Sequence, residues 1–364
     1  MKKFKVLYMV SSLVKQGPNI VLRNLLQAIN TDLFEVHVLT FKQEKDNSLI
    51  EEITRNEKIK LHFCQYERLG SVSSINSIIE MINPDIVHSH GFSADFINAI
   101  SIQKNQRKIT TIHSYIYRDY YFEHGLKGII AALIHNIILF KFDVVCACSD
   151  SVMRYLKKIF IKSLSVRNGV PDYKKNINME NQHVMERIKS EHKFIFTFVG
   201  RLMARKNLFY MLDSFICSKR LDDSIFLIIG DGPDEKELKL KYGHIPQVRF
   251  LGFLENTLYY MSYSDYLVLV SKAEGLPMVV LEGLSVGIPV ILSNINPHRE
   301  VFEVSQAQIG YILNENNNNL KDIFDNILKP NGEYKKICLD SFANYFSSSL
   351  MAKKYEEVYS GAKK

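Results

Sequence analysis

Short, nearly continuous apolar runs alternate along this chain with segments in which apolar residues recur every three or four positions. Continuous runs predict strands buried on both faces of a parallel sheet, and the longer period predicts amphipathic helices. Their alternation predicts an α/β fold with a doubly wound parallel sheet. In the first half, strands are predicted at Phe4–Val10, Val36–Phe41, Ile86–His90, Ile109–His113 and Val144–Cys148, and helices include Asn19–Ile29 and Ile75–Ile82.

A second series of predicted strands follows, and 364 residues are enough for two domains. Strand patterning lapses between Arg167 and Glu191, where Asn168-Gly169-Val170-Pro171 favours a turn. We expect domains at 1–170 and 171–345 that face a cleft, and a C-terminal helix at 346–364 that packs back toward the first domain. The second series comprises Phe194–Val199, Ile225–Ile229, Val248–Leu251, Tyr266–Val270 and Val290–Leu292.

The formal net charge of +7 comes from the first domain, because residues 1–170 hold 22 Lys and Arg against 15 Asp and Glu. The basic residues form no RNP pattern, zinc finger or lysine-rich arm, so an anionic membrane surface is a better candidate partner than nucleic acid. The longest apolar run, Ile129–Phe140, is shorter than the roughly 18 residues of a membrane span. Five cysteines without metal or disulfide spacing favour a reducing cytoplasm.

The segment 273–283 follows a predicted strand and carries two glutamates. Pro277 suits the first position of a helix, so the N–H groups of Met278 and Val279 would point toward an anion such as a diphosphate. Glu282, about one turn further in, can accept hydrogen bonds from ribose hydroxyls, and Glu274 from a second ring. Taken alone, each glutamate is better explained without a ligand, Glu274 as a solvated loop residue and Glu282 as an ordinary helix residue near a favourable dipole end.

A basic loop, Gly200-Arg201-Leu202-Met203-Ala204-Arg205-Lys206-Asn207, follows another predicted strand. Arg201 and Lys206 would therefore lie at the carboxyl edge of the sheet, where open α/β sheets bind ligands. Their charges can stabilise a departing diphosphate without a metal ion, and the chain has no Asp-x-Asp motif. By itself the loop is equally consistent with Arg201 paired to a carboxylate.

Together these motifs resemble one family. Glu274 and Glu282, separated by seven residues and preceded by the Gly-Arg-x(4)-Lys-Asn loop and the turn 229–233, look like the retaining glycosyltransferases of family 4. The resemblance implies the GT-B architecture of two Rossmann-like domains facing a cleft. It also implies a nucleotide-sugar donor bound by the second domain and an acceptor bound by the first.

The family pattern then implies roles in the second domain. Arg201 and Lys206 would hold the donor diphosphate together with the backbone of Met278 and Val279. Glu282 would bind the ribose and Glu274 the transferred sugar. The residues expected near the nucleoside and its base are Gly230, Asp231 and Phe253.

In the first domain the pattern matches His113, which would reach the transferred sugar, and Gly17, where backbone would approach the donor phosphates. His113, Glu274, Arg201 and Lys206 are thus the expected catalytic residues. Pro18 departs from the second glycine of many relatives and has no N–H to donate, although it suits the start of a helix.

The expected function is transfer of a sugar from a nucleotide-sugar to a glycan acceptor, with retention of the anomeric configuration. UDP is the leading candidate for the nucleotide, and GDP is left open. The acceptor is expected to be lipid-linked and to belong to cell-surface polysaccharide synthesis. The enzyme would need no cofactor or metal and would lie in the cytoplasm, peripherally on the membrane. The sequence does not match a dinucleotide-binding oxidoreductase, because Glu235 occupies the position where a Rossmann fingerprint needs its third glycine. A sugar-nucleotide epimerase, which needs no acceptor, and a non-catalytic membrane scaffold, which needs no nucleotide, remain as alternatives.

Overall fold

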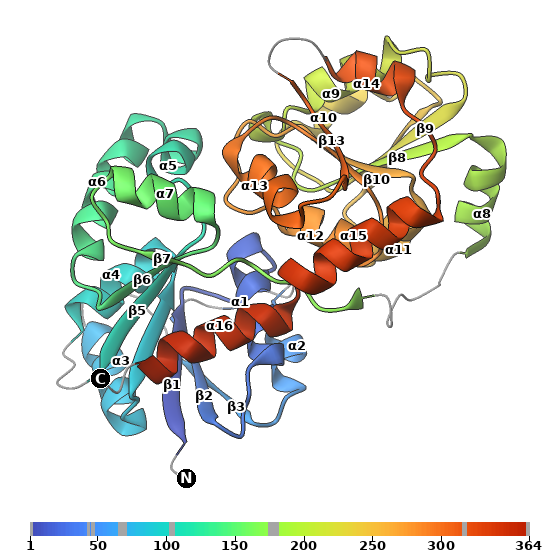
Figure 1. Ribbon diagram of the computed structural model, residues 1–364. Helices are drawn as coiled ribbons and strands as arrows, with labels where there is room; N and C mark the ends of the chain where they lie inside the picture. The colour runs from blue at the N-terminus through green and yellow to red at the C-terminus, as the bar shows by residue number, and fades with distance from the viewer. Residues whose placement is uncertain are drawn as a thin grey trace. The chain divides into compact units, whose positions relative to one another are not determined.

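A computed structural model describes residues 3–41, 44, 48–64, 71–101, 106–173, 182–314 and 319–361. The chain divides into two compact units (Figure 1). Unit 1 comprises Met1–Gly169 and Ser348–Lys364, and unit 2 comprises Val170–Ser347. Each unit is built around its own parallel sheet.

Unit 1 holds a sheet of order β3-β2-β1-β4-β5-β6-β7 in which every pairing is parallel. The strands are β1 (Phe4–Val10), β2 (Phe34–Thr40), β3 (Ile59–Phe63), β4 (Ile86–His90), β5 (Arg107–Ile112), β6 (Val144–Ala147) and β7 (Leu164–Ser165). The helices are α1 (Gly17–Ala28), α2 (Ile50–Thr54), α3 (Ser71–Ile82), α4 (Phe92–Ile100), α5 (Ile116–His124), α6 (Leu126–Leu139), α7 (Asp150–Lys158) and α16 (Ser348–Ser360).

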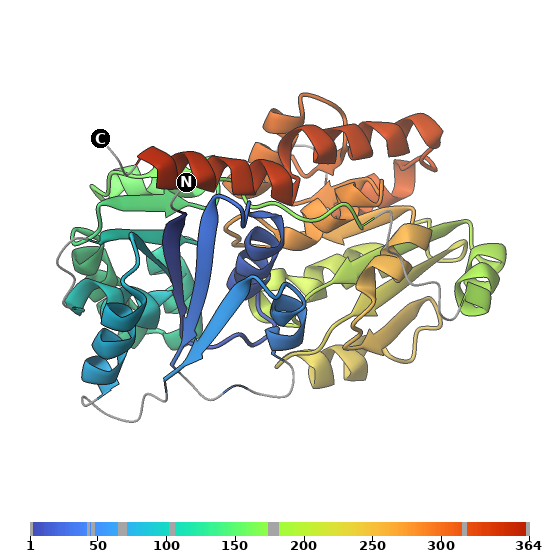
Figure 2. The same ribbon diagram turned by 90° about the horizontal axis from the view of Figure 1, so that it is seen from below.

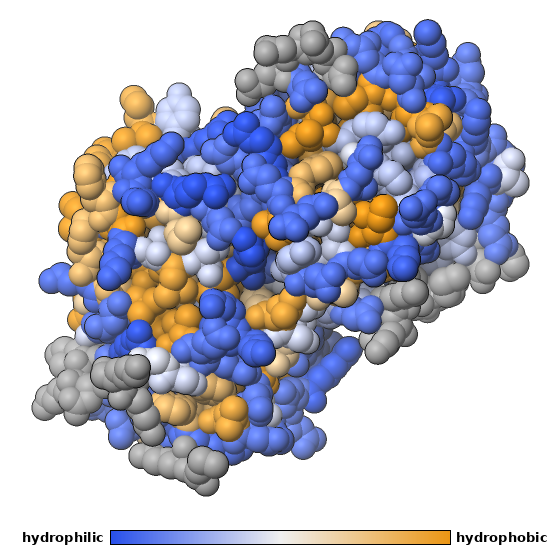
Figure 3. Space-filling view, in the orientation of Figure 1, coloured by the Kyte–Doolittle hydropathy of each residue, from blue (hydrophilic) through white to orange (hydrophobic). Residues whose placement is uncertain are grey.

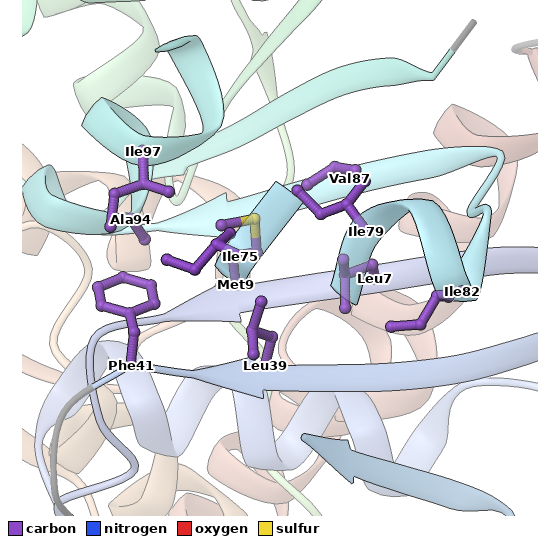
Figure 4. Packing of buried hydrophobic residues seen from close by; sticks show 10 residues of the cluster. All are labelled: Leu7, Met9, Leu39, Phe41, Ile75, Ile79, Ile82, Val87, Ala94 and Ile97. Atoms are coloured by element: carbon purple, nitrogen blue, oxygen red, sulfur yellow. The ribbon is translucent and has the colours of Figure 1, made fainter. Parts of the chain in front are cut away.

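One face of this sheet is covered by α3 and α4. Leu7 and Met9 of β1 point to this face because alternate residues of a strand share a side. There they meet Ile75 and Ile79, which recur at helical spacing on α3 (Figure 4). All four side chains are buried, and full burial of each such side chain stabilises the fold by about 1.5–3 kcal/mol.

The intervening residue of β1, Tyr8, points to the other face, where α16 lies along the sheet (Figure 2). Tyr355 and Tyr359, one helical turn apart, carry their hydroxyls into the core. The Tyr359 hydroxyl lies 3.0 Å from that of Tyr8 and 2.7 Å from Nδ1 of His88. The Tyr355 hydroxyl contacts Oγ1 of Thr111 at 2.8 Å, and the same oxygen lies 2.8 Å from Nε2 of His88. Both His88 nitrogens are thus satisfied, while burial lowers the pKa of His88 to about 3 and keeps the ring neutral.

Unit 2 holds a parallel sheet of order β10-β9-β8-β11-β12-β13. Its strands are β8 (Phe194–Val199), β9 (Ser224–Ile229), β10 (Val248–Gly252), β11 (Tyr266–Leu269), β12 (Val290–Leu292) and β13 (Gly310–Ile312). Its helices are α8 (Gln182–Glu191), α9 (Leu208–Ile216), α10 (Glu235–Tyr242), α11 (Thr257–Tyr263), α12 (Met278–Ser285), α13 (Asn296–Ser305), α14 (Leu320–Asn326) and α15 (Gly332–Tyr345).

In both sheets the chain winds outward from the first strand in one direction and then returns to continue in the other. The reversal falls between β1 and β4 in unit 1 and between β8 and β11 in unit 2. At such switch points the loops after the two neighbouring strands leave the same carboxyl edge toward opposite faces of the sheet, and open α/β sheets bind their ligands at this edge. The prediction of two doubly wound parallel sheets is therefore confirmed.

All ten predicted strands occur, with ends shifted by at most two residues. No strand was predicted at the positions of β3, β7 and β13. These strands are short or carry exposed and half-buried side chains, so they lack a continuous apolar run.

The contact of α16 with the sheet yields the first prediction. Tyr359→Phe removes a hydroxyl that serves both Tyr8 and Nδ1 of His88, leaving buried polar groups without this partner. We expect the free energy of unfolding, measured by urea denaturation, to fall by about 1–3 kcal/mol. The control is Tyr121→Phe, whose side chain is exposed. Equal stability of the two variants would show that the buried hydroxyls do not hold α16 in place.

Candidate functional site

The switch point of unit 2 brings together two loops that lie far apart in the sequence. β8 and β11 are parallel neighbours, so the loops that follow them leave the same edge of the sheet. The first loop ends in a 3₁₀ turn, Ala204–Lys206, and the backbone N–H of Lys272 in the second donates to the carbonyl of Arg205 at 2.8 Å. Across this junction Nζ of Lys206 donates to Oε1 of Glu274 at 2.6 Å.

This ion pair is buried, with side-chain exposures of 12% for Lys206 and 8% for Glu274. Burial alone would raise the pKa of Glu274, but the charges of Lys206 and Arg205 and the hydrogen bond from Lys206 outweigh it and hold that pKa below its usual value. Glu274 is therefore an ionised carboxylate at neutral pH. It can still accept hydrogen bonds beyond the one from Lys206, because a carboxylate has about four lone-pair sites.

The same loop leads into α12, whose first turn faces the carboxyl edge. Pro277 is the N-cap and has extended backbone angles, so the prediction that it occupies the first helical position was wrong by one residue. The Pro277 carbonyl accepts the first helical hydrogen bonds, from the N–H groups of Val280 and Leu281. The N–H groups of Met278 and Val279 precede those bonds and form the positive end of the helix dipole. This arrangement can bind an anion.

Glu282 is the fifth residue of α12 and is half-buried. Arg201, two residues after the end of β8, is exposed, and none of the described carboxylates forms an ion pair with it. Its charge is thus available at this edge of the sheet.

The loop after β9 packs directly on the loop after β8. A Cβ on Gly230 would lie 2.0 Å from the carbonyl oxygen of Gly200, and one on Gly232 would lie 2.2 Å from that of Leu202. These two glycines are therefore required by close backbone packing. Asp231, between them, is exposed, and its carbonyl accepts from the Leu202 N–H at 2.7 Å.

Phe253 lies beside this junction, directly after Gly252, whose carbonyl accepts from the N–H of Gly230 at 2.7 Å. The Phe253 side chain is 57% exposed. An exposed aromatic ring next to a loop at the carboxyl edge is suited to stack on a flat ring.

The remaining predicted residues belong to unit 1. Gly17 begins α1, Pro18 lies in its first turn, and nothing in the chain lies within 4 Å of a Cβ built on Gly17. His113 follows β5, and its Nε2 lies 2.9 Å from Nδ1 of His90, which ends β4. Burial lowers the pKa of His113 to about 4, against the opposing charge of Asp95. Among the residues described, Nδ1 of His113 is buried without a hydrogen-bond partner.

A further residue at this edge, His298 in the first turn of α13, was not predicted from the sequence. It is fully buried, and its electrostatic neighbours include Glu274 and Lys206. The only available signal was its position shortly after a strand, at the edge where α/β sheets bind ligands. The expected residues of unit 2 thus gather at one edge of its sheet, with His298 added to them.

Two doubly wound parallel sheets, one in each unit, are the architecture of the GT-B class of glycosyltransferase fold. Residues 16–171 match the model described as Glycosyltransferase Family 4, and residues 180–337 match that of glycosyl transferases group 1. The chain belongs to this family of glycosyltransferases.

The similarity to known proteins extends over nearly the whole chain. An Escherichia coli protein named O-antigen biosynthesis glycosyltransferase WclY is 27% identical, with 98% of each chain covered. The Escherichia coli UDP-Gal:alpha-D-GlcNAc-diphosphoundecaprenol alpha-1,3-galactosyltransferase is 24% identical, covering 80% of this chain and 79% of its own. The crystal structure of Anabaena Alr3699/HepE in complex with UDP-glucose shares the fold, with a TM-score of 0.78 at 16% identity and coverage of 98% and 99%.

Two further findings concern the described residues only. No helix among them is long and apolar enough to cross a membrane. Within the same ranges, no three His, Cys, Asp or Glu side chains are grouped closely enough to hold a metal ion.

The buried ion pair yields the second prediction. Lys206→Met leaves the Glu274 carboxylate buried without its counter-charge, and we expect a loss of about 3–5 kcal/mol in the free energy of unfolding at pH 7. Adding Glu274→Gln should recover much of this loss, because the buried charge is then gone. The measurement is urea denaturation of both single variants and the double variant.

The stability that the Lys206–Glu274 ion pair contributes depends on pH in a definite direction. The lowered pKa of Glu274 contributes stability above its ordinary value of 4.5, and this contribution is lost as pH falls through the folded-state value. The penalty of Lys206→Met should therefore shrink in acid, where a protonated Glu274 needs no counter-charge. The matched control is Lys236→Met, an exposed lysine of α10. If Lys206→Met is as stable as this control at pH 7, the pair does not have the energetic role assigned to it.

Proposed function

We propose that this glycosyltransferase takes its sugar from a nucleotide-sugar donor bound by unit 2. The observation that carries the proposal is the buried Lys206–Glu274 pair beside the N-terminus of α12, at a switch point of the kind where α/β sheets bind nucleotides. A UDP-glucose complex of one structural neighbour and the UDP-Gal donor in the name of one relative support UDP as the nucleotide.

In this proposal the donor diphosphate binds the N–H groups of Met278 and Val279. Arg201 and Lys206 add positive charge, and Lys206 has two ammonium protons left beyond its bond to Glu274. Glu274 accepts hydrogen bonds from the transferred sugar, Glu282 from the ribose, and Phe253 borders the base. His113, from unit 1, contacts the transferred sugar.

Transfer is proposed to proceed with retention of the anomeric configuration. The bond between C1 of the sugar and the diphosphate oxygen breaks as an acceptor hydroxyl attacks C1 from the same face. The acceptor proton passes to the departing phosphate oxygen. Negative charge grows on the diphosphate, where the helix dipole and the two basic side chains stabilise it without a metal ion.

The proposed acceptor is a lipid-linked glycan of cell-surface polysaccharide synthesis. The names of two relatives support this: one refers to O-antigen biosynthesis and the other to a diphosphoundecaprenol acceptor. A lipid-linked acceptor would require the enzyme to work at the membrane surface.

The surface of α6 is suited to that location. Leu126, Ile130, Leu133, Ile137 and Phe140 recur at helical spacing, and each is at least 50% exposed. Apolar side chains lie along this edge of unit 1 (Figure 3). An exposed apolar stripe of this length marks a binding surface, and an amphipathic helix can bury such a stripe at the lipid boundary.

The opposite face of α6 is anchored in unit 1 through His135. Its Nε2 lies 2.8 Å from the buried Asp95 carboxylate, and its Nδ1 lies 2.8 Å from the Tyr120 hydroxyl. Exposed lysines, Lys127 and Lys141, stand at the two ends of the stripe, where they can contact anionic headgroups.

The third prediction concerns the donor. In a thermal-shift screen of UDP-glucose, UDP-galactose and GDP-mannose, at least one UDP-sugar should stabilise the protein, by about 2.7 kcal/mol at 100 times its dissociation constant. Glu282→Ala should weaken that binding by about 10- to 100-fold, because charge-assisted hydrogen bonds to the ribose are lost. Binding and transfer should persist in EDTA.

The matched control is Glu303→Ala, an exposed glutamate of α13. Equal affinity of Glu282→Ala and Glu303→Ala for the stabilising donor would remove Glu282 from the site. Transfer that stops in EDTA and returns with Mg²⁺ would contradict the metal-free account of the leaving group.

The fourth prediction concerns the membrane. The protein should co-sediment with liposomes that contain anionic lipid, and binding should weaken as salt screens the surface charge. The double variant Ile130→Asp/Ile137→Asp should lose binding because it places charge in the apolar stripe. Changing Arg154, Lys157 and Lys158 of α7, all exposed, to Ser should reduce binding by removing positive charge.

Leu240→Asp, at an 84% exposed position of unit 2, is the control for added surface charge. Recovery of the unmodified protein in the supernatant with both neutral and anionic liposomes at low salt would rule out this membrane surface and favour a soluble acceptor.

A further inference from the structure

His298 of unit 2 is fully buried, and its two ring nitrogens differ in their hydrogen bonding within the described ranges. Its Nδ1 lies 3.0 Å from the backbone carbonyl oxygen of Ser293 and 3.0 Å from the Ser293 hydroxyl. Its Nε2 is buried and has no hydrogen-bond partner in the part of the chain that the structure describes. An unsatisfied buried nitrogen is costly unless a ligand supplies the missing partner.

The contacts of Nδ1 determine which nitrogen carries the proton. A carbonyl oxygen can only accept, so Nδ1 must be the donor to Ser293. The Ser293 hydroxyl donates its own proton to the carbonyl of Ser271 at 2.6 Å and is therefore not available as a donor to the ring. Burial lowers the pKa of His298 to about 4, against the charge of Glu274, so the ring is neutral at pH 7. Its Nε2 is consequently a bare acceptor.

His298 belongs to the edge where the candidate site lies. It begins α13 just after β12, and β12 is the parallel neighbour of β11, which leads to Glu274. The charges of Glu274 and Lys206 both act on its ring. The hydroxyl oxygen of Ser271, which is also buried at this edge, has no hydrogen-bond partner among the described residues.

The chemistry of a bare acceptor selects its ligand. A diphosphate presents only acceptor oxygens at neutral pH and would be repelled by the Nε2 lone pair. A sugar hydroxyl donates to Nε2 and can at the same time accept from an ammonium group such as that of Lys206. The site beside Glu274 therefore favours a polyhydroxylated ring over a phosphate.

We propose that Nε2 of His298 accepts a hydrogen bond from a hydroxyl of the transferred sugar and so contributes to the choice of donor sugar. This assignment rests on the proposed function, because it places the sugar of a nucleotide-sugar beside Glu274. His298 then acts with Glu274 as a second acceptor, with the difference that its acceptor atom is neutral. A missing or inverted hydroxyl would leave Nε2 unpaired, which is how such sites reject close analogues.

The test separates the sugar from the nucleotide. Dissociation constants of UDP, UDP-glucose and UDP-galactose are measured by calorimetry without an acceptor. In His298→Asn the side-chain amide can still donate to Ser293, but no acceptor remains at the position of Nε2. We expect UDP to bind unchanged, and the better of the two UDP-sugars to bind about 10- to 100-fold more weakly. His298→Gln, whose Oε1 lies near the position of Nε2, should regain part of the loss.

The control is His244→Asn, an exposed histidine of the same unit, which should bind all three ligands as the wild type does. The assignment is overturned if His298→Asn weakens UDP and the UDP-sugar equally, or leaves both unchanged. If the wild-type protein binds UDP and no UDP-sugar, the assignment fails while the nucleotide site stands. If it binds none of the three, UDP is not the nucleotide and the assignment falls with the proposed donor.

A second measurement does not depend on the stability of any variant. With ¹⁵N-labelled histidine, the NMR signals of His298 at pH 7 should show a proton on Nδ1 and none on Nε2. Adding the stabilising UDP-sugar should shift the Nε2 resonance, whereas UDP should leave it in place. A proton on Nε2, or an equal response to UDP, would overturn the proposal.

Discussion

The candidate site depends on the parallel pairing of β8 with β11. These strands are separated by more than 60 residues of sequence, yet their neighbouring positions send the Lys206 loop and the Glu274 loop to one edge of the sheet. Burying a carboxylate there requires a counter-charge, because the desolvation of an unpaired ion costs several kcal/mol. The Lys206–Glu274 pair meets this requirement and keeps the carboxylate ionised where an apolar environment would otherwise neutralise it. The same edge carries the N-terminus of α12, so a negatively charged acceptor lies beside the positive end of a helix dipole.

In unit 1 a buried polar side chain, the His88 ring, is stabilised by neutral hydroxyl groups. His88 lies in the middle of a parallel sheet, where burial keeps its ring uncharged, and hydroxyls from α16 and β5 satisfy both of its nitrogens. The last helix of the chain is therefore part of the core of the first unit. His90 and His113, at the carboxyl ends of β4 and β5, contact each other, and each has one ring nitrogen with no partner among the described residues. The satisfied histidine is structural, and the other two lie at the carboxyl edge of the sheet, where open α/β sheets bind ligands.

Much of this arrangement could be predicted from the sequence, for a physical reason. Strands buried on both faces are continuous apolar runs, so β1 and β8 were evident, whereas β3 and β13, with partly exposed side chains, were not. Glu274 and Lys206 were predicted singly from motifs. Their ion pair was not predicted, because it depends on which strands are neighbours. His298 was missed because its significance lies in an unsatisfied nitrogen, which is a property of the packed environment and leaves no pattern in the sequence. Gly230 was predicted from a motif to lie near the nucleoside. The structure adds a second reason for a glycine there, which is its close packing against the Gly200 backbone.

In the proposed function, the edge formed by β8, β11 and α12 holds the diphosphate and the sugar of a nucleotide-sugar. A crystal structure determined with the UDP-sugar that stabilises the protein tests it most directly. We expect the phosphate oxygens to lie within hydrogen-bond distance of the Met278 and Val279 N–H groups and the sugar to lie against Glu274 and His298. A diphosphate bound elsewhere on the protein, with the Lys206–Glu274 pair remote from the sugar, would contradict it.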